Sequence, residues 1–141
     1  MHTLLRMLCA ALLVMLTPPA LAAEDPLFAQ MGGKAGIDRL VDVSVDVYLA
    51  DPRIAVIFAE SNIERLRTQL KDQFCQVAGG PCDYQGLNMV EAHKGLKLKG
   101  FDFNVLVEDL QIAMDRVGLP FAVQNRFLAR LAPMRPQVVS Q

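Results

Sequence analysis

The sequence predicts an all-α domain built on four principal helices. In four long stretches of the 141-residue chain, apolar residues recur at the three- and four-residue spacing of amphipathic helices. No stretch alternates apolar and polar residues as a half-buried strand would, and there is no internal repeat or low-complexity segment. Because 52% of the residues are hydrophobic, the chain can form one compact core.

The first residues are ordered like a secretory signal peptide, which we place at residues 1–22. Arg6 supplies the positive start, an apolar run covers residues 7–16, and a small-residue cleavage site ends at Ala22. A retained N-terminal anchor is the alternative, although the apolar run is too short to span a bilayer. We therefore expect a mature domain over residues 23–141 that is periplasmic or secreted, without stable membrane association after cleavage.

The first principal helix is expected from Ile37 to Tyr48, where apolar or small residues follow one face and Val45 points inward. Asp51 and Pro52 have the form of an N-cap followed by a proline in the first helical turn. A short helix should therefore start there and carry the apolar residues Ile54, Ile57 and Phe58.

A capping-box pattern at Ser61 and Glu64 predicts the start of the second long helix. Its turn-forming end lies at residues 79–81, which read Gly-Gly-Pro. The residues of its expected buried stripe are Ile63, Leu66, Leu70, Phe74 and Val77.

The C-terminal half predicts one brief helix and two long ones. The brief helix covers Met89 to Lys94 and ends at Gly95. Pro133 and Pro136 should end the last helix. The inner faces of the two long helices read Phe103, Leu106, Val107, Leu110, Met114 and Val117, then Phe121, Phe127, Leu128 and Leu131.

Charge gives no reason to expect nucleic acid as a partner. The chain has 14 Lys and Arg against 15 Asp and Glu, and signal cleavage removes only Arg6 from these charges.

Signal cleavage also removes Cys9 and leaves two cysteines, Cys75 and Cys82, in a compartment that permits disulfides. A bridge and two unpaired thiols both stay open, because the sequence does not show the distance between them.

His93 is the single histidine of the mature chain, and this scarcity excludes several mechanisms. One histidine and two widely spaced cysteines cannot form a structural zinc site. No serine or cysteine stands in a recognisable nucleophile motif, and the Cys-x-x-Cys-His signature of covalent haem attachment is absent. One imidazole in an apolar helical core suits five-coordinate haem iron, although a solitary histidine is also commonly structural.

Several motifs in a fixed order decide between these alternatives. They are the glycine motifs at 31–37 and 78–81, the Leu-Ala-Asp-Pro-Arg turn at 49–53, Phe58, Tyr84-Gln85-Gly86, Met89 to His93, Leu98, Phe103 and Leu131-Ala132-Pro133. On these motifs, from Asp25 to Val138, the chain resembles the group I truncated haemoglobins. This resemblance implies a truncated globin-like fold, a two-over-two helical sandwich.

The resemblance also implies a non-covalent haem b whose iron is bound by His93. Phe58 would pack on the porphyrin face. Such a residue can also be part of the ordinary apolar core, because the two roles are compatible in a globin. Lys94 and Lys97 lie near the expected propionates, but we expect them to be solvated surface residues. The other residues expected to contact the cofactor are Leu66, Leu70, Met89, Leu98 and Phe103.

The sequence departs from the family on the distal side, opposite the iron-binding histidine. Many members place a tyrosine and a glutamine there to hydrogen-bond oxygen, whereas the corresponding positions here are Val45, Leu66 and Leu70. We expect Tyr48, one turn after Ser44, to serve packing instead. Gln69 and Gln73 lie off the buried stripe and should face solvent or the haem edge.

The predicted function is reversible binding of a diatomic gas, namely oxygen, nitric oxide or carbon monoxide. A donor hydrogen bond to oxygen is worth on the order of 1 kcal/mol, so an apolar distal pocket should favour nitric oxide or carbon monoxide. One alternative is a nitric oxide dioxygenase-type enzyme supplied by an external electron donor. A haem-free helical module that binds a partner is the other.

Overall fold

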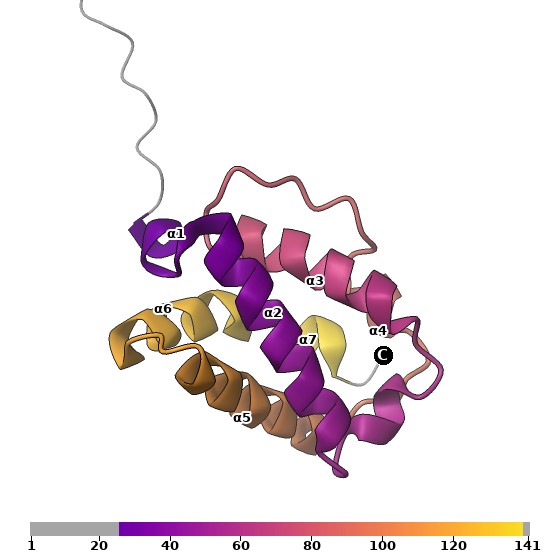
Figure 1. Cartoon of the computed structure of the whole chain (residues 1–141). Coiled ribbons are helices and arrows are strands. Elements are labelled where there is room, and N and C mark those ends of the chain that lie inside the picture. The colour runs from indigo at the N-terminus through magenta and orange to yellow at the C-terminus, as the bar shows by residue number, and fades with distance from the viewer. Residues whose placement is uncertain (1–25, 140–141) are drawn as a thin grey trace, which may run out of the picture.

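The computed structural model describes residues 26–139 and contains helices but no strand over that range (Figure 1). The predicted signal peptide, residues 1–22, lies outside the described residues. The all-α prediction is confirmed. The long helices are α2 (Gly33–Ala50), α3 (Ile63–Val77), α5 (Gly100–Arg116) and α6 (Phe121–Leu131), and the short ones are α1 (Pro26–Gln30), η1 (Ala55–Phe58), α4 (Met89–His93), η2 (Ala132–Met134) and α7 (Arg135–Val138).

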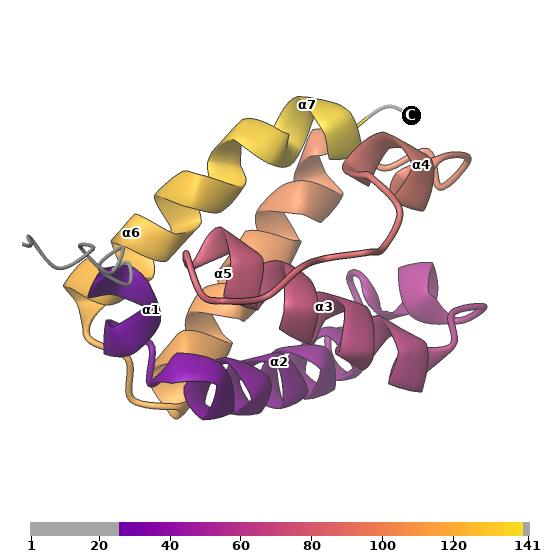
Figure 2. The same ribbon diagram turned by 90° about the horizontal axis from the view of Figure 1, so that it is seen from above.

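The four long helices form two pairs that lie across each other. Helix α2 packs against both α3 and α5, and α6 also packs against α3 and α5. Figure 2 shows the pair of α2 and α3 crossing the pair of α5 and α6. The short helix α4 lies at one end of this sandwich and packs against α7.

The core lies between these pairs and is centred on α2. Ile37, Val41 and Val45 of α2 are completely buried. Phe74 of α3 meets Phe127 of α6 edge to face, with ring centroids 5.0 Å apart. Burial of one such side chain contributes roughly 2–3 kcal/mol, so this half of the molecule is the stable part of the scaffold.

The glycine motif at 31–37 allows α1 and α2 to meet in a tight turn. Gly32 has a φ of 85°, which side chains other than glycine rarely adopt. A Cβ atom on Gly36 would lie 2.1 Å from the carbonyl oxygen of Met31. Glycine is therefore required for steric reasons at these two positions of the motif.

Two predicted helix starts differ from the structure. Asp51 ends α2, because its N–H donates to the Val47 oxygen at 3.1 Å, and the next helical turn is the 3₁₀ segment η1. Asn62, and not Ser61, caps α3, because its side-chain oxygen accepts from the Arg65 N–H at 2.9 Å.

The end of the chain also differs from the prediction. Pro133 and Pro136 do not stop the helical chain, since η2 and α7 each carry a proline in their first turn, where its missing N–H is not needed. These two short helices return the C-terminal segment toward α4. Among the helices of residues 26–139, none has the length and apolar character needed to cross a membrane.

Candidate functional site

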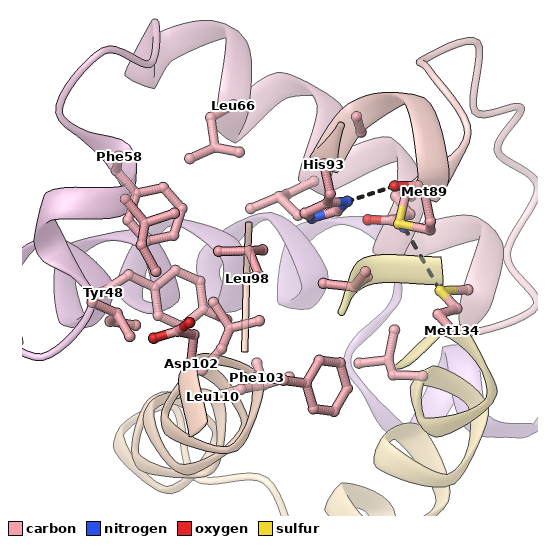
Figure 3. Close-up of a pocket in the computed structure, with 18 of the residues that line it drawn as sticks. Tyr48, Phe58, Leu66, Met89, His93, Leu98, Asp102, Phe103, Leu110 and Met134 are labelled. Carbon is pink, nitrogen blue, oxygen red and sulfur yellow. Dashed lines mark hydrogen bonds between the residues drawn. The ribbon is translucent and has the colours of Figure 1, made fainter. Parts of the chain in front are cut away.

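A cavity of about 910 Å³ lies beside the C-terminal end of α2, enclosed by η1, α3, α4, α5 and the C-terminal segment (Figure 3). Its wall is largely apolar. The lining includes Tyr48, Ile54, Ile57, Phe58, Leu66, Gln69, Leu70, Phe74, Tyr84, Leu87, Met89, His93, Leu96, Leu98, Phe103, Leu106, Leu110, Leu128, Leu131, Met134 and Val138.

His93 is the side chain in this cavity that can bind a metal through nitrogen. It ends α4, which starts at Met89 because the Asn88 side chain accepts from the Glu91 N–H at 2.9 Å. Its Nδ1 lies 2.7 Å from the Met89 carbonyl oxygen. Since a carbonyl only accepts, Nδ1 carries a proton, and in the neutral imidazole Nε2 then keeps the lone pair that can bind a metal. Such a bond to the other ring nitrogen is the usual way a metal-binding histidine is oriented.

No other arrangement of ligands competes with this single imidazole in the described structure. Residues 26–139 contain no group of three or more His, Cys, Asp or Glu side chains that could hold a metal ion. A metal at His93 would therefore have to bring most of its own ligands. A porphyrin iron does so, because the macrocycle supplies four nitrogens.

The structure places all the predicted cofactor contacts on one cavity. Phe58 comes from η1, Leu66 and Leu70 from α3, Met89 from α4, Leu98 from the segment before α5, and Phe103 from α5. Figure 3 shows Phe58, Leu66, Met89, Leu98 and Phe103, which come from separate elements, around the same space as His93. Their roles toward a cofactor remain predictions, but their convergence is a property of the structure.

Val45 is the exception among the predicted distal residues. It is completely buried in the core and does not line the cavity, because the cavity lies alongside the end of α2, one turn further on. The residue of α2 that reaches the cavity is Tyr48. Its ring stacks on Phe58 with centroids 5.9 Å apart and an interplanar angle of 11°. The expected packing role of Tyr48 thus takes place at the cavity wall.

The Tyr48 side chain is buried at the cavity wall, one turn after Ser44. Burial raises the pKa of Tyr48, against the opposing effect of a side-chain hydrogen bond to Ser44. Ser44 Oγ donates to the Leu40 carbonyl at 2.7 Å, so its own proton is used within α2. Because its pKa is raised, the Tyr48 phenol is neutral at the wall of the cavity.

Gln73 was expected near solvent or the haem edge but is buried. Its amide nitrogen lies 3.2 Å from Met89 Sδ and 3.9 Å from Met134 Sδ, so it links α3 to α4 and to the C-terminal segment. Gln69 lines the cavity. Gln69 is three residues after Leu66 and Gln73 is three residues after Leu70, a helical spacing that places both glutamines on the cavity face of α3 and that can be read from the sequence.

Other wall residues come from segments for which no site role was predicted. Tyr84 and Leu87 belong to the connection between α3 and α4, and Met134 belongs to η2. Arg65 lies at the exposed edge of the cavity, whereas Lys94 and Lys97 are exposed and do not line it. Arg65 is thus the basic residue at this edge, and the sequence analysis did not predict a role for it.

Cys75 and Cys82 are joined by a disulfide, with their Cα atoms 5.8 Å apart. Cys75 is fully buried at the end of α3, and Cys82 lies in the connection that follows. The bridge therefore closes the Gly79-Gly80-Pro81 turn.

The residues of the cavity fit a haem group. A volume of about 910 Å³ with an apolar wall can bury a flat porphyrin, and the exposed lining residues Asn62, Arg65 and Leu87 leave an open edge for its propionates. His93 Nε2 supplies one axial ligand. No cysteine lies next to His93, in keeping with a non-covalent cofactor.

Known proteins match both the sequence and the fold. Residues 26–140 match the bacterial-like globin family. A group 1 truncated haemoglobin of Tetrahymena thermophila is 33% identical over 96 residues, which cover 68% of this chain and 79% of the relative. One of Synechocystis is 33% identical over 98 residues, covering 67% and 79%.

Solved structures agree with this assignment. The truncated haemoglobin of Tetrahymena pyriformis, in its Fe(III) form, superimposes with a TM-score of 0.79 at 27% identity and covers 82% of this chain and 98% of its own. The 2/2 haemoglobin of Synechococcus has a TM-score of 0.76 at 22% identity, with coverage of 80% and 97%, and so supports the fold alone. The fold is the predicted two-over-two helical sandwich, and the chain belongs to the bacterial-like globin family.

Proposed function

We propose that this globin holds haem b non-covalently through His93 and reversibly binds a diatomic gas on the opposite side, with nitric oxide or carbon monoxide favoured over oxygen. Binding of haem and of a gas follows from membership of the globin family. The observation that carries the assignment to this site is the Nδ1 contact of His93 with the Met89 oxygen, which leaves Nε2 free in an apolar cavity.

When bound, haem supplies an iron with one coordination position for His93 and one for a gas. The side chains of the chain determine what a gas meets there. Leu66 and Leu70 of α3 line the cavity with hydrocarbon. These residues offer no hydrogen bond to a ligand, and this supports the proposed preference, since oxygen gains most from a donor.

Leu66→Gln tests the ligand preference, because it places an amide donor on the cavity wall. We expect oxygen to dissociate several-fold more slowly, as a hydrogen bond of about 1 kcal/mol predicts, with carbon monoxide dissociation little changed. Leu66→Met is the matched apolar control. Stopped-flow measurement of both ligands gives the ratio; equal ratios in wild type and Leu66→Gln would contradict the proposal.

The cellular setting is part of the same proposal. We propose export to the periplasm or beyond, supported by the sequence of residues 1–22 and by the Cys75–Cys82 bridge, which an oxidising compartment would preserve. An external electron donor would keep the iron ferrous, while nucleic acid and membrane are not proposed as partners. The N-terminus of protein from a periplasmic fraction should be Ala23, and an intact Met1 in that fraction would contradict signal cleavage.

A further inference from the structure

The connection between α3 and α4 forms part of the haem cavity and leads directly to His93. It covers residues 78–88 without helix and runs along α3 toward α4 (Figure 2). Tyr84 and Leu87 of this connection line the cavity, and Asn88 caps the helix that carries His93. A shift of the connection would therefore move both the cavity wall and the helix that carries His93.

The first half of the connection is held by the disulfide and by the turn that it closes. The Gly80 N–H donates to the Cys75 oxygen at 2.9 Å, and the Cys82 N–H donates to the Gly80 oxygen at 2.9 Å. A Cβ on Gly80 would lie 2.4 Å from the Phe28 ring and 2.8 Å from Cys75 Sγ. This turn is thus pressed against the core, with Cys75 as its buried anchor.

The second half is held through Tyr84. Its N–H donates to the Gln76 side-chain oxygen at 2.8 Å, and its hydroxyl donates to the Leu87 oxygen at 2.8 Å. Cys82 is two residues before Tyr84, so the disulfide limits how far Tyr84 can move from α3. A series of contacts therefore runs from α3, through the disulfide and Tyr84, to Leu87 at the cavity.

The bridge is placed where a reductant can reach it. Cys75 is completely buried, but Cys82 is only partly buried and stands between the exposed residues Pro81 and Asp83. A thiolate can attack Cys82 Sγ without prior unfolding of the core. After reduction, the exposed hydrogen bond between Tyr84 and Gln76 remains, and water competes for such a bond.

We propose that the Cys75–Cys82 disulfide is a redox-sensitive tether that positions the Tyr84–Leu87 wall and the helix of His93, so that its reduction speeds loss of haem. The reductant is a dithiol. It gives two electrons and two protons, the S–S bond breaks to two cysteine thiols, and the dithiol becomes a disulfide. The effect on haem depends on the proposed function, whereas the effect on the connection does not.

Hydrogen exchange tests the tether itself. The purified wild-type protein, with its disulfide intact, is compared with Cys82→Ser. Both are ferric and no reductant is added, so the oxidation state of the iron is the same in the two samples. We expect faster exchange in residues 82–93 of the variant and unchanged exchange in α5 and α6. Equal exchange in residues 82–93, or an equal increase in all helices, would overturn the proposal. If the chain took up no haem, the proposed function would fail, but the same comparison on the haem-free protein would still test the tether.

Transfer of haem to an acceptor globin tests the consequence. We expect Cys82→Ser to lose haem about tenfold faster than wild type, and Gln76→Ala to add to this effect. A dithiol should accelerate loss from wild type and have no effect on the Cys75→Ala/Cys82→Ala variant. Ile37→Val, which weakens the core near the start of α2 and does not touch the cavity, controls for general destabilisation and should leave haem loss near the wild-type rate. Unchanged loss from Cys82→Ser, or a dithiol effect without cysteines, would contradict the proposal.

Discussion

The ring of Tyr48 stacks on the ring of Phe58 at 5.9 Å, so the end of α2 and the segment η1 meet at the wall of the cavity. This pair determines where α2 touches the site.

Tyr48→Phe separates a packing role from a ligand-binding role. The variant keeps the stacked ring and removes the hydrogen bond to Ser44, so we expect a loss of about 1 kcal/mol in the free energy of unfolding. Oxygen dissociation should change less than twofold, because we expect Tyr48 to serve packing and not ligand binding. Chemical denaturation and stopped-flow kinetics measure the two effects; several-fold faster oxygen release would show that Tyr48 is a distal donor after all.

Phe58→Ala should weaken both the aromatic pair and the cavity wall. The stack contributes roughly 0.5–1.5 kcal/mol beyond area burial, so a double-mutant cycle with Tyr48→Leu should give a coupling of that size. Haem transfer to an acceptor should also be faster in Phe58→Ala than in the milder control Phe58→Leu. Zero coupling would mean that the two rings are merely adjacent.

Asp109 of α5 is a buried carboxyl whose effect on stability should depend on pH. It is 1% exposed, and its Oδ2 has no hydrogen-bond partner within residues 26–139. Burial, with the nearby Asp51 carboxylate, raises the pKa of Asp109 despite the guanidinium of Arg53, and Glu108 acts in the same direction as Asp51. The folded state disfavours the ionised form of Asp109. The contribution of the protonated Asp109 to the stability of the fold is therefore fully present below the ordinary carboxyl pKa, and it is lost as pH rises through the raised pKa.

Asp109→Asn should therefore stabilise the protein at pH 7, by roughly 1 kcal/mol, and this gain should vanish toward pH 3. Thermal unfolding across this pH range measures it. Asp83→Asn, at an exposed position of the connection between α3 and α4, is the control and should show a small change. A gain from Asp109→Asn that grew toward acid would have the wrong sign for this account.

Asn62→Ala tests the observed start of α3. Loss of the bond to the Arg65 N–H should cost about 1 kcal/mol of unfolding free energy. Ser61→Ala, at the position that the sequence favoured as the cap, should cost much less. If the two variants lost equal stability, the cap assignment would be incorrect.

Periodicity predicted the long helices because their apolar faces repeat over several turns, as in the stripe from Ile63 to Val77. It did not distinguish Ser61 from Asn62 as the cap, since both side chains can accept from a free amide and only the backbone path decides.

The motif around His93 predicted a residue that the structure places on the cavity, whereas other positions depend on the folded geometry. Val45 and Tyr48 lie about one turn apart on the same side of α2, and only the position of the cavity along that helix selects Tyr48. Gln73 lies off the apolar stripe of α3, which predicts a place near solvent or the haem edge. Its burial depends on Met89 and Met134, which are remote in sequence and meet it only in the folded chain.

The absorption spectrum of the haem-reconstituted protein, compared with that of His93→Ala, tests the central claim most directly. We expect stoichiometric haem uptake, a five-coordinate ferrous form and a sharp shift of the Soret band with carbon monoxide, all of which depend on His93. Haem uptake and a carbon monoxide complex that are the same in His93→Ala would contradict the assignment of His93 as the iron ligand.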